Sequence, residues 1–247
     1  MPQKNQQNLA VITTDIPEQA AAEVIVNEIS QYLPHKRVLL LLAGGSAVAI
    51  YPLLLEQLNK LGNLQNLTVT VGDERWNLNP AHEQANWRQI QNSGFFGQIG
   101  KMGARIYRVL QGKSLAEEAQ RFNDFLQQQL ELKAKIISVQ GIGGDGHTAG
   151  IFPADKAEFK NIYQKQGWAI AHNLGKNNYA ERITISPKFM AKVNTFVLFA
   201  KGLDKLPIFK TLLKLAQTNK REVFEYPALL ALKGNCILVT TLEFQLN

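Results

Sequence analysis

The sequence predicts an α/β fold in which helices cover both faces of a mostly parallel sheet. Short apolar runs that fit strands alternate with longer segments of helical periodicity, which is the order expected of this fold class. Runs such as 37–42 are apolar without alternation, as strands buried on both faces are. Three of the runs end in clusters of glycine or charge, at 44–46, 73–75 and 143–147. A length of 247 residues favours one domain over residues 1–247.

The individual elements follow from these patterns in chain order. Strands are predicted at 9–13, 37–42, 67–71, 106–109, 136–139, 169–172, 182–186, 195–200 and 236–240. Helices are predicted after Asp15, over 47–58, near Trp87, over 114–133, from Pro187, from Gly202 and over 227–231. The segment between Pro153 and Gln166 is polar and predicts irregular structure.

Two of the helices carry recognisable start signals. Asp15 is expected to cap the first helix, with Pro17 in its first turn. Ser114 and Glu117 have the spacing of a capping box, which predicts the start of a long helix.

Composition excludes several classes of protein. A single cysteine, Cys236, allows neither an intramolecular disulfide nor a cysteine-based zinc cluster, and favours a cytoplasmic location. The longest apolar run, at 38–43, is far below the roughly 20 residues of a membrane helix. The polar start at 1–8 lacks a signal peptide's apolar region. The net charge of +7 comes from lysines and arginines scattered over 101–247 without an aromatic stripe, so we expect no nucleic-acid partner.

The segment 138–153 carries the clearest chemical signal. It begins as an apolar run and continues into five glycines, with Asp145 and His147 two residues apart. A strand that ends in such a loop delivers polar side chains to the carboxyl edge of a parallel sheet. There His147 is a candidate general base, with Asp145 as its orienting partner or as a residue that only closes the turn. A glycine-rich turn that carries a surface histidine is the alternative.

Two other strand ends have the chemistry of a binding site. A strand, then Gly44-Gly45-Ser46, then a helix is a combination that can bind anions through backbone N–H groups and a hydroxyl. Tight packing of the strand against the helix is the alternative explanation for the paired glycines. It lacks the lysine of a Walker loop and the third glycine of a dinucleotide fingerprint. Three consecutive charges, Asp73-Glu74-Arg75, follow the next strand and indicate either a site or a solvated turn.

Together these motifs resemble the 6-phosphogluconolactonases, a branch of the group that also contains the glucosamine-6-phosphate deaminases. The resemblance rests on motifs in the family's order, over most of the chain: Ala43-Gly44-Gly45-Ser46 with Tyr51, Asp73-Glu74-Arg75, Asp145-Gly146-His147-Thr148-Ala149 with Phe152-Pro153, Arg182-Ile183-Thr184, and Gly202 to Lys205. It implies a Rossmann-like three-layer α/β/α sandwich. The sequence departs from the family pattern at Ala47-Val48, at Gly72, where a bulky residue is usual, at Ala85 and in the tail at 240–244.

The resemblance implies hydrolysis of 6-phospho-D-glucono-1,5-lactone to 6-phosphogluconate, a step of the oxidative pentose phosphate pathway. His147 would activate water, with Asp145 and Arg75 as further catalytic residues. Arg75 either stabilises the oxyanion or only pairs with its neighbouring carboxylates. The substrate and its phosphate would be bound by the following residues: Gly44, Gly45, Ser46, Asp73, Asn86, Arg182 and Lys205.

Other readings stay open at this point. A deaminase-isomerase of the same fold would act on an amino-sugar phosphate, and a sugar-phosphate-binding protein would catalyse nothing. Arg75 and Thr148-Ala149-Gly150 favour the lactonase branch. His35, His82 and His172 resemble surface or structural histidines. We expect no metal, no cofactor and no membrane partner, and either a monomer or a homodimer.

Overall fold

The central element is a parallel sheet of seven strands. The computed structural model describes residues 9–174, 179–217 and 222–241. The strand order is β1-β10-β9-β6-β2-β3-β5, and every neighbouring pair in it is parallel. The strands are β1 (Leu9–Thr13), β2 (Val38–Leu42), β3 (Leu67–Val71), β5 (Arg105–Ile106), β6 (Lys135–Gly141), β9 (Thr195–Ala200) and β10 (Cys236–Thr240).

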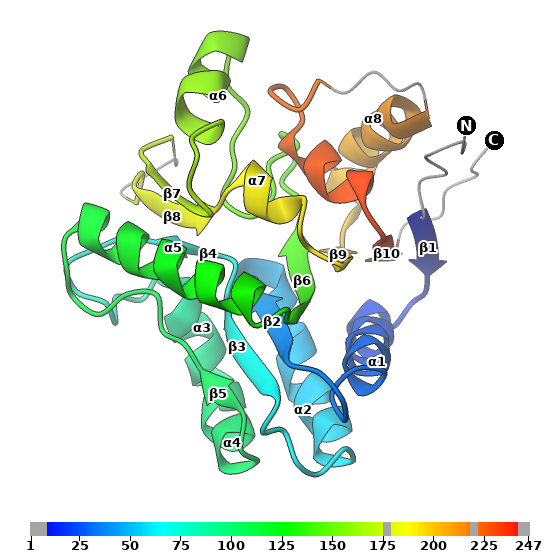
Figure 1. Cartoon of the computed structure of the whole chain (residues 1–247). Helices are drawn as coiled ribbons and strands as arrows, with labels where there is room; N and C mark the ends of the chain where they lie inside the picture. The colour runs from blue at the N-terminus through cyan, green and yellow to red at the C-terminus, as the bar shows by residue number, and fades with distance from the viewer. Residues whose placement is uncertain (1–8, 175–178, 218–221, 242–247) are drawn as a thin grey trace, which may run out of the picture.

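Helices cover both faces of this sheet, so the predicted three-layer α/β/α sandwich is confirmed (Figure 1). Helix α1 packs against α2 and β9, whereas α5 lies on the other side, against a second, smaller sheet. The helices are α1 (Pro17–Ser30), α2 (Tyr51–Asn59), α3 (Asn86–Asn92), α4 (Phe95–Lys101), α5 (Leu115–Glu131), α6 (Lys156–Tyr163), α7 (Pro187–Met190) and α8 (Leu206–Gln217), with the 3₁₀ helices η1 (Gly45–Ile50), η2 (Leu203–Lys205) and η3 (Pro227–Lys233).

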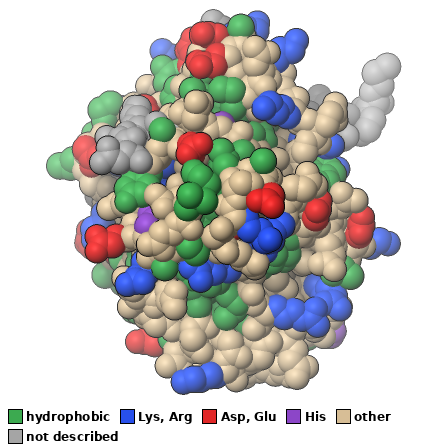
Figure 2. Space-filling model, turned by 90° about the vertical axis from the view of Figure 1, so that its left-hand side faces the viewer, with side chains coloured by type: hydrophobic (Ala, Val, Ile, Leu, Met, Phe, Trp, Pro, Cys, Tyr) green, Lys and Arg blue, Asp and Glu red, His purple; other side chains and the backbone are tan. Residues whose placement is uncertain are grey.

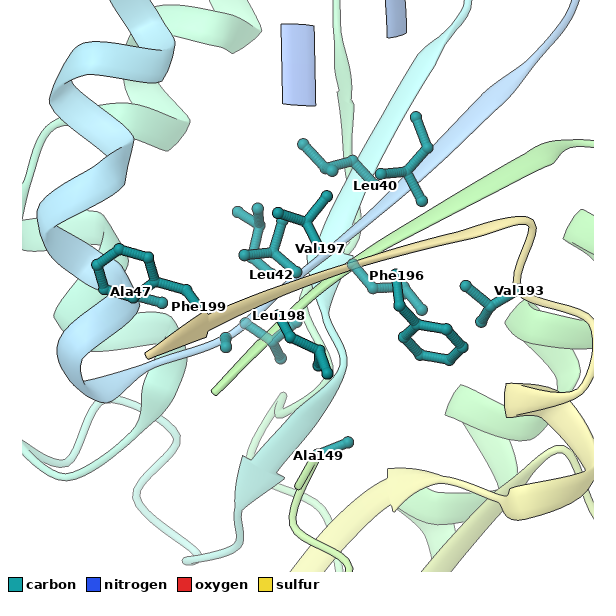
Figure 3. Packing of buried hydrophobic residues seen from close by; sticks show 14 of the residues in the cluster. Leu40, Leu42, Ala47, Ala149, Val193, Phe196, Val197, Leu198 and Phe199 are labelled. Carbon is teal, nitrogen blue, oxygen red and sulfur yellow. The ribbon is translucent and has the colours of Figure 1, made fainter. Parts of the chain in front are cut away.

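The core lies on both sides of the central strands. Every residue of β2, β3 and β9 is buried, as the unalternating apolar runs predict. Figure 3 shows Phe196 and Leu198 of β9 directed to one side of the sheet and Phe199, beside Ala47, on the other. This double burial fixes the register of the strands, and therefore the place where each of them ends.

The smaller sheet was not predicted as a separate unit. It is antiparallel, in the order β4-β8-β7, and consists of β4 (Asp73–Arg75), β8 (Arg182–Ile185) and β7 (Ala169–His172). The charged triplet after β3 is thus neither a continuation of the main sheet nor a solvated turn, because its backbone pairs with β8.

Four predictions of local structure need correction. The strand predicted at 106–109 is shorter and begins earlier, at Arg105–Ile106. Ile16, not Asp15, is the N-cap residue of α1, and no side chain caps it. The segment before Gln166 contains α6, capped by the Asp155 carboxylate, which accepts from two backbone N–H groups at 2.9 Å. The helix predicted over 47–58 begins as the 3₁₀ helix η1 and becomes α-helical only at Tyr51. By contrast, the capping box of Ser114 and Glu117 is confirmed.

Some sequence features fall partly or wholly outside the described ranges, namely the polar start at 1–8, part of the connection between the strands predicted at 169–172 and 182–186, and most of the tail at 240–244. Within the described residues, no helix is both long and apolar enough to cross a bilayer. On the face shown in Figure 2, lysines and arginines are interspersed with acidic, apolar and uncharged side chains.

Candidate active site

The carboxyl ends of β2, β3, β6 and β9 meet at one edge of the main sheet, because the strands are parallel. A pocket of about 280 Å³ lies at this edge. Of the ten predicted site residues, nine line it: Gly44, Gly45, Ser46, Asp73, Arg75, Asn86, His147, Arg182 and Lys205. The tenth, Asp145, is hydrogen-bonded to His147. The structure therefore brings the predicted residues together in one place.

Asp145 and His147 form a hydrogen-bonded pair. His147 Nδ1 lies 2.5 Å from Asp145 Oδ1, and the same oxygen accepts the His147 backbone N–H at 3.1 Å. A Cβ at Gly143 would lie 2.0 Å from His147 Nδ1, so only glycine allows the imidazole to approach the loop this closely. Since a carboxylate only accepts, the proton resides on Nδ1 and the lone pair of Nε2 is available.

Asp73 and Glu74 are adjacent carboxylates with different surroundings. Asp73 lines the pocket. Burial raises the pKa of Asp73, while the nearby charges of Arg182, Arg75 and His147 act to lower it. Glu74 is fully buried and accepts the N–H groups of Asn86 (2.6 Å), Arg75 (2.8 Å) and Trp87 (2.8 Å). Burial raises the pKa of Glu74 to about 7 against these three donors. Glu74 thus anchors the start of α3, and of the two carboxylates only Asp73 lines the pocket.

Arg75 is held by its own loop. Its Nη1 donates to the backbone oxygen and to the Oε1 of Gln84, both at 2.9 Å, and its backbone oxygen lies 2.8 Å from His82 Nε2. Asn86 is buried and donates from Nδ2 to the backbone oxygen of Asp73 at 2.9 Å. These contacts fix both residues at the rim of the pocket before any ligand binds.

Two further cations reach the pocket from distant segments. Arg182 is 7% exposed, donates to the backbone oxygen of Tyr179, and places its guanidinium carbon 5.8 Å from the ring centroid of Phe152. Lys205 Nζ lies 2.9 Å from Asp204 Oδ2. Together with Arg75 they surround the pocket with positive charge, which suits an anionic ligand.

The Gly44-Gly45-Ser46 turn follows β2 directly. Tyr51 holds its first residue, since the Tyr51 hydroxyl accepts the Ala43 N–H at 2.9 Å and donates to the Ala43 oxygen at 2.5 Å. We expected free backbone N–H groups here, but the Gly45 N–H is occupied by Gln89 Oε1 at 2.8 Å. The anion-binding capacity of the turn is therefore smaller than the sequence suggests.

Comparison with known proteins agrees with this geometry. The family model described as glucosamine-6-phosphate isomerases/6-phosphogluconolactonase matches residues 13–239. The chain belongs to this family. A 6-phosphogluconolactonase of Pseudomonas aeruginosa is 32% identical over 54% of this chain, and the match spans 53% of that protein, about half its length. A 6-phosphogluconolactonase of Xylella fastidiosa is 25% identical over 83% of this chain and 80% of its own.

The fold is also that of solved members of the family. The structure of a 6-phosphogluconolactonase from Plasmodium vivax superposes with a TM-score of 0.76 over 96% of this chain and 91% of that one. The sequence identity is 18%, so this likeness establishes the fold alone.

The other histidines are not all alike. His82 and His172 are buried and His35 is exposed. The His172 Nε2 lies 2.9 Å from the Gly150 oxygen, and its Nδ1 accepts the Leu174 N–H at 3.2 Å. Burial lowers the pKa of His172 to about 4. His172 is thus a neutral, structural histidine, one of the two alternatives that the sequence left open.

Sequence reasoning missed other residues of the pocket. Gln140, Ala149, Gly150 and Phe152 line it as well. Phe152 was part of the family string but had no assigned role, and Gln140, directly after the strand predicted at 136–139, had none either. The signal of Gln140 was present, because an amide at the end of an apolar run departs from the pattern of a buried strand.

A larger pocket, of about 520 Å³, is formed by residues of α6, α7 and η3 and contains none of the predicted site residues. Within the described ranges, no group of three or more histidine, cysteine, aspartate and glutamate side chains is placed to hold a metal ion. The metal-free reaction stays a prediction that chelation can test.

Proposed function

We propose that this protein hydrolyses 6-phospho-D-glucono-1,5-lactone to 6-phosphogluconate. The observation that carries the proposal is the hydrogen-bonded Asp145–His147 pair at the edge of a pocket that three cationic side chains line. Membership of the family and its curated relatives, which are named 6-phosphogluconolactonase, support the same reaction.

The reaction needs a base, and His147 fits that role. With Nδ1–H donated to Asp145, Nε2 takes a proton from water as the water oxygen attacks the lactone carbonyl. The carbonyl becomes a tetrahedral oxyanion, and the ring C–O bond then breaks. The ring oxygen leaves as an alkoxide and receives the proton back from Nε2. Asp145 acts by fixing the tautomer and by stabilising the imidazolium.

The charges around the pocket divide between the oxyanion and the phosphate. Arg75, fixed by Gln84, is assigned to the oxyanion. Arg182, Lys205 and the turn with Ser46 are assigned to the phosphate, which charged hydrogen bonds recognise well. A carboxyl group does not attract an anionic phosphate, so we assign Asp73, together with Asn86, to the sugar ring.

We also propose that the reaction takes place in the cytoplasm, without a cofactor, in a monomer or homodimer. The free thiol of Cys236 is buried and burial raises its pKa to about 12, which fits a protein that relies on no disulfide.

The test is a lactone-hydrolysis assay, with 6-phosphogluconolactone generated in the cuvette and the spontaneous opening rate subtracted. A rate that grows in proportion to protein concentration supports the proposal. Release of ammonia from glucosamine 6-phosphate, without lactone hydrolysis, would assign the protein to the deaminase branch. Binding of the phosphorylated sugar without turnover would make it a binding protein.

A further inference from the structure

Gln140 is a buried amide in the floor of the candidate active site. It is 1% exposed, yet it lines the pocket together with His147 and Asp73. Its Nε2 donates to Ser138 Oγ at 2.9 Å, whereas its Oε1 has no hydrogen-bond partner among the described residues. A buried carbonyl oxygen without a donor destabilises a fold, so stability does not explain an amide at this position.

The register of the sheet places Gln140 on the side of the reacting loop. Gln140 of β6 pairs with Leu198 of β9, and paired residues of neighbouring strands project to the same face. Figure 3 shows Leu198 on the face of the sheet toward which Ala149 lies. Ala149 belongs to the loop that carries His147, and both residues line the pocket with Gln140.

Gly72 leaves room for this amide. A Cβ at position 72 would lie 2.4 Å from Gln140 Nε2, closer than any two such atoms approach. Gly72 is not among the glycines with positive φ, so its backbone conformation does not require glycine. The Gln140 amide therefore occupies the space that a side chain at position 72 would need.

We propose that Gln140 Oε1 accepts a hydrogen bond from a ring hydroxyl of the substrate and so makes the pocket selective for a polyhydroxylated lactone. This inference rests on the proposed function. Of the groups on a phosphorylated sugar lactone, the ring hydroxyls are the donors, since the ionised phosphate, the carbonyl and the ring oxygen only accept. A site built to bond a hydroxyl discriminates against the analogue that lacks it.

The experiment compares 6-phosphogluconolactone with its 2-deoxy, 3-deoxy and 4-deoxy forms in the wild type and in Gln140→Met. Methionine keeps an unbranched chain of similar length and removes the amide. In the wild type, kcat/KM should favour the parent over one deoxy-lactone by roughly 2- to 12-fold, the value of one neutral hydrogen bond. In Gln140→Met this ratio should fall to about one. Because both substrates meet the same protein sample, a partly inactive variant does not distort the ratio.

Thr70→Val provides a matched control. Thr70 Oγ1 is also buried and has no hydrogen-bond partner among the described residues. Leu41 of β2 pairs with both Thr70 and Ser138, so the three lie in one row across the sheet, but Thr70 does not line the pocket. Removal of the Thr70 hydroxyl should leave the kcat/KM ratio of the parent to each of the three deoxy-lactones as it is in the wild type. Gly72→Ala should act like Gln140→Met, because it displaces the amide, and should add nothing in a Gln140→Ala background.

Dissociation constants of 6-phosphogluconate and its three deoxy forms, measured by calorimetry, repeat the comparison without turnover. A protein that binds these acids with Gln140-dependent discrimination but hydrolyses no lactone would refute the proposed function and keep the role of Gln140. Equal ratios in the wild type and Gln140→Met, as expected if a bound water satisfies Oε1, would overturn the inference. So would an equal change in Thr70→Val.

Discussion

The rings of His147 and His172 both lie close to the ring of Phe152, but the two histidines have different surroundings. The ring centroid of Phe152 is 4.8 Å from that of His147 and 6.1 Å from that of His172. The His147 side chain is 37% exposed, at the pocket, with one nitrogen bonded to a carboxylate. His172 is 7% exposed, and its two nitrogens are hydrogen-bonded to neutral backbone groups, the Gly150 oxygen and the Leu174 N–H.

The difference shows that partners decide the role of a histidine. A carboxylate beside one ring nitrogen stabilises the imidazolium that forms when the other nitrogen takes a proton. In His172, the Leu174 backbone N–H donates to Nδ1. The lone pair of Nδ1 is therefore occupied and cannot take a proton, which keeps the ring neutral. We therefore expect changes at His147 to alter the rate and changes at His172 to alter stability.

The largest effect is expected from His147→Asn. General-base catalysis is typically worth about 10²–10⁴-fold, so kcat for the lactone should fall by that factor with little change in KM. The melting temperature should stay close to that of the wild type, since the side chain is partly exposed. His35→Asn, at an exposed site away from the pocket, is the control. A folded His147→Asn protein with nearly full activity would remove the base assignment.

His172 should contribute a pH-dependent part of the stability. Its pKa is about 4 in the folded protein and 6.5 in the unfolded reference, so the unfolded chain takes up the proton first as the pH falls. Stability from this group is complete above pH 6.5 and is lost between 6.5 and about 4, by about 3 kcal/mol. Urea unfolding of the wild type and His172→Gln over this range gives the contribution as their difference. A difference independent of pH would contradict the buried, neutral state.

Arg182 is close to both histidines, because its backbone pairs with His172 in the smaller sheet and its side chain lines the pocket with His147. Arg182→Ala and Lys205→Ala should mainly raise KM, by about 10- to 150-fold, since a charged hydrogen bond is worth roughly 1.5–3 kcal/mol. Lys201→Ala is the control, because Lys201 pairs with Glu18 and does not line the pocket. If both pocket variants bind the phosphorylated lactone as the wild type does, the phosphate site lies elsewhere.

The smallest expected effect is that of a chelator. A base mechanism centred on His147 needs no divalent ion, so dialysis against EDTA should leave the rate unchanged. If activity is lost and zinc or magnesium restores it, the attacking water would be activated by a metal ion and not by the imidazole of His147.

The sequence predicted the main sheet and the strand-end residues because their signals are local. Apolar runs such as Leu67–Val71 and the glycines around His147 are visible without knowledge of the fold. The smaller sheet was missed because β4 consists of three charged residues, and only their long-range pairing with β8 makes them a strand. The burial of Glu74 and Gln140 likewise depends on partners far away in the chain, Trp87 and Gly72 among them. The phenylalanine and tyrosine four residues apart in α6, Phe159 and Tyr163, gave a signal that was not used.

The acid limb of the kcat profile tests the central claim most directly. The claim is that His147, and not His172, takes the proton from water. The kcat of the wild type and of His172→Gln should fall as the pH is lowered, because a base that takes a proton from water has to be unprotonated. The low residual kcat of His147→Asn should follow no such limb. A limb that persists in His147→Asn, or that disappears in folded His172→Gln, would contradict the account.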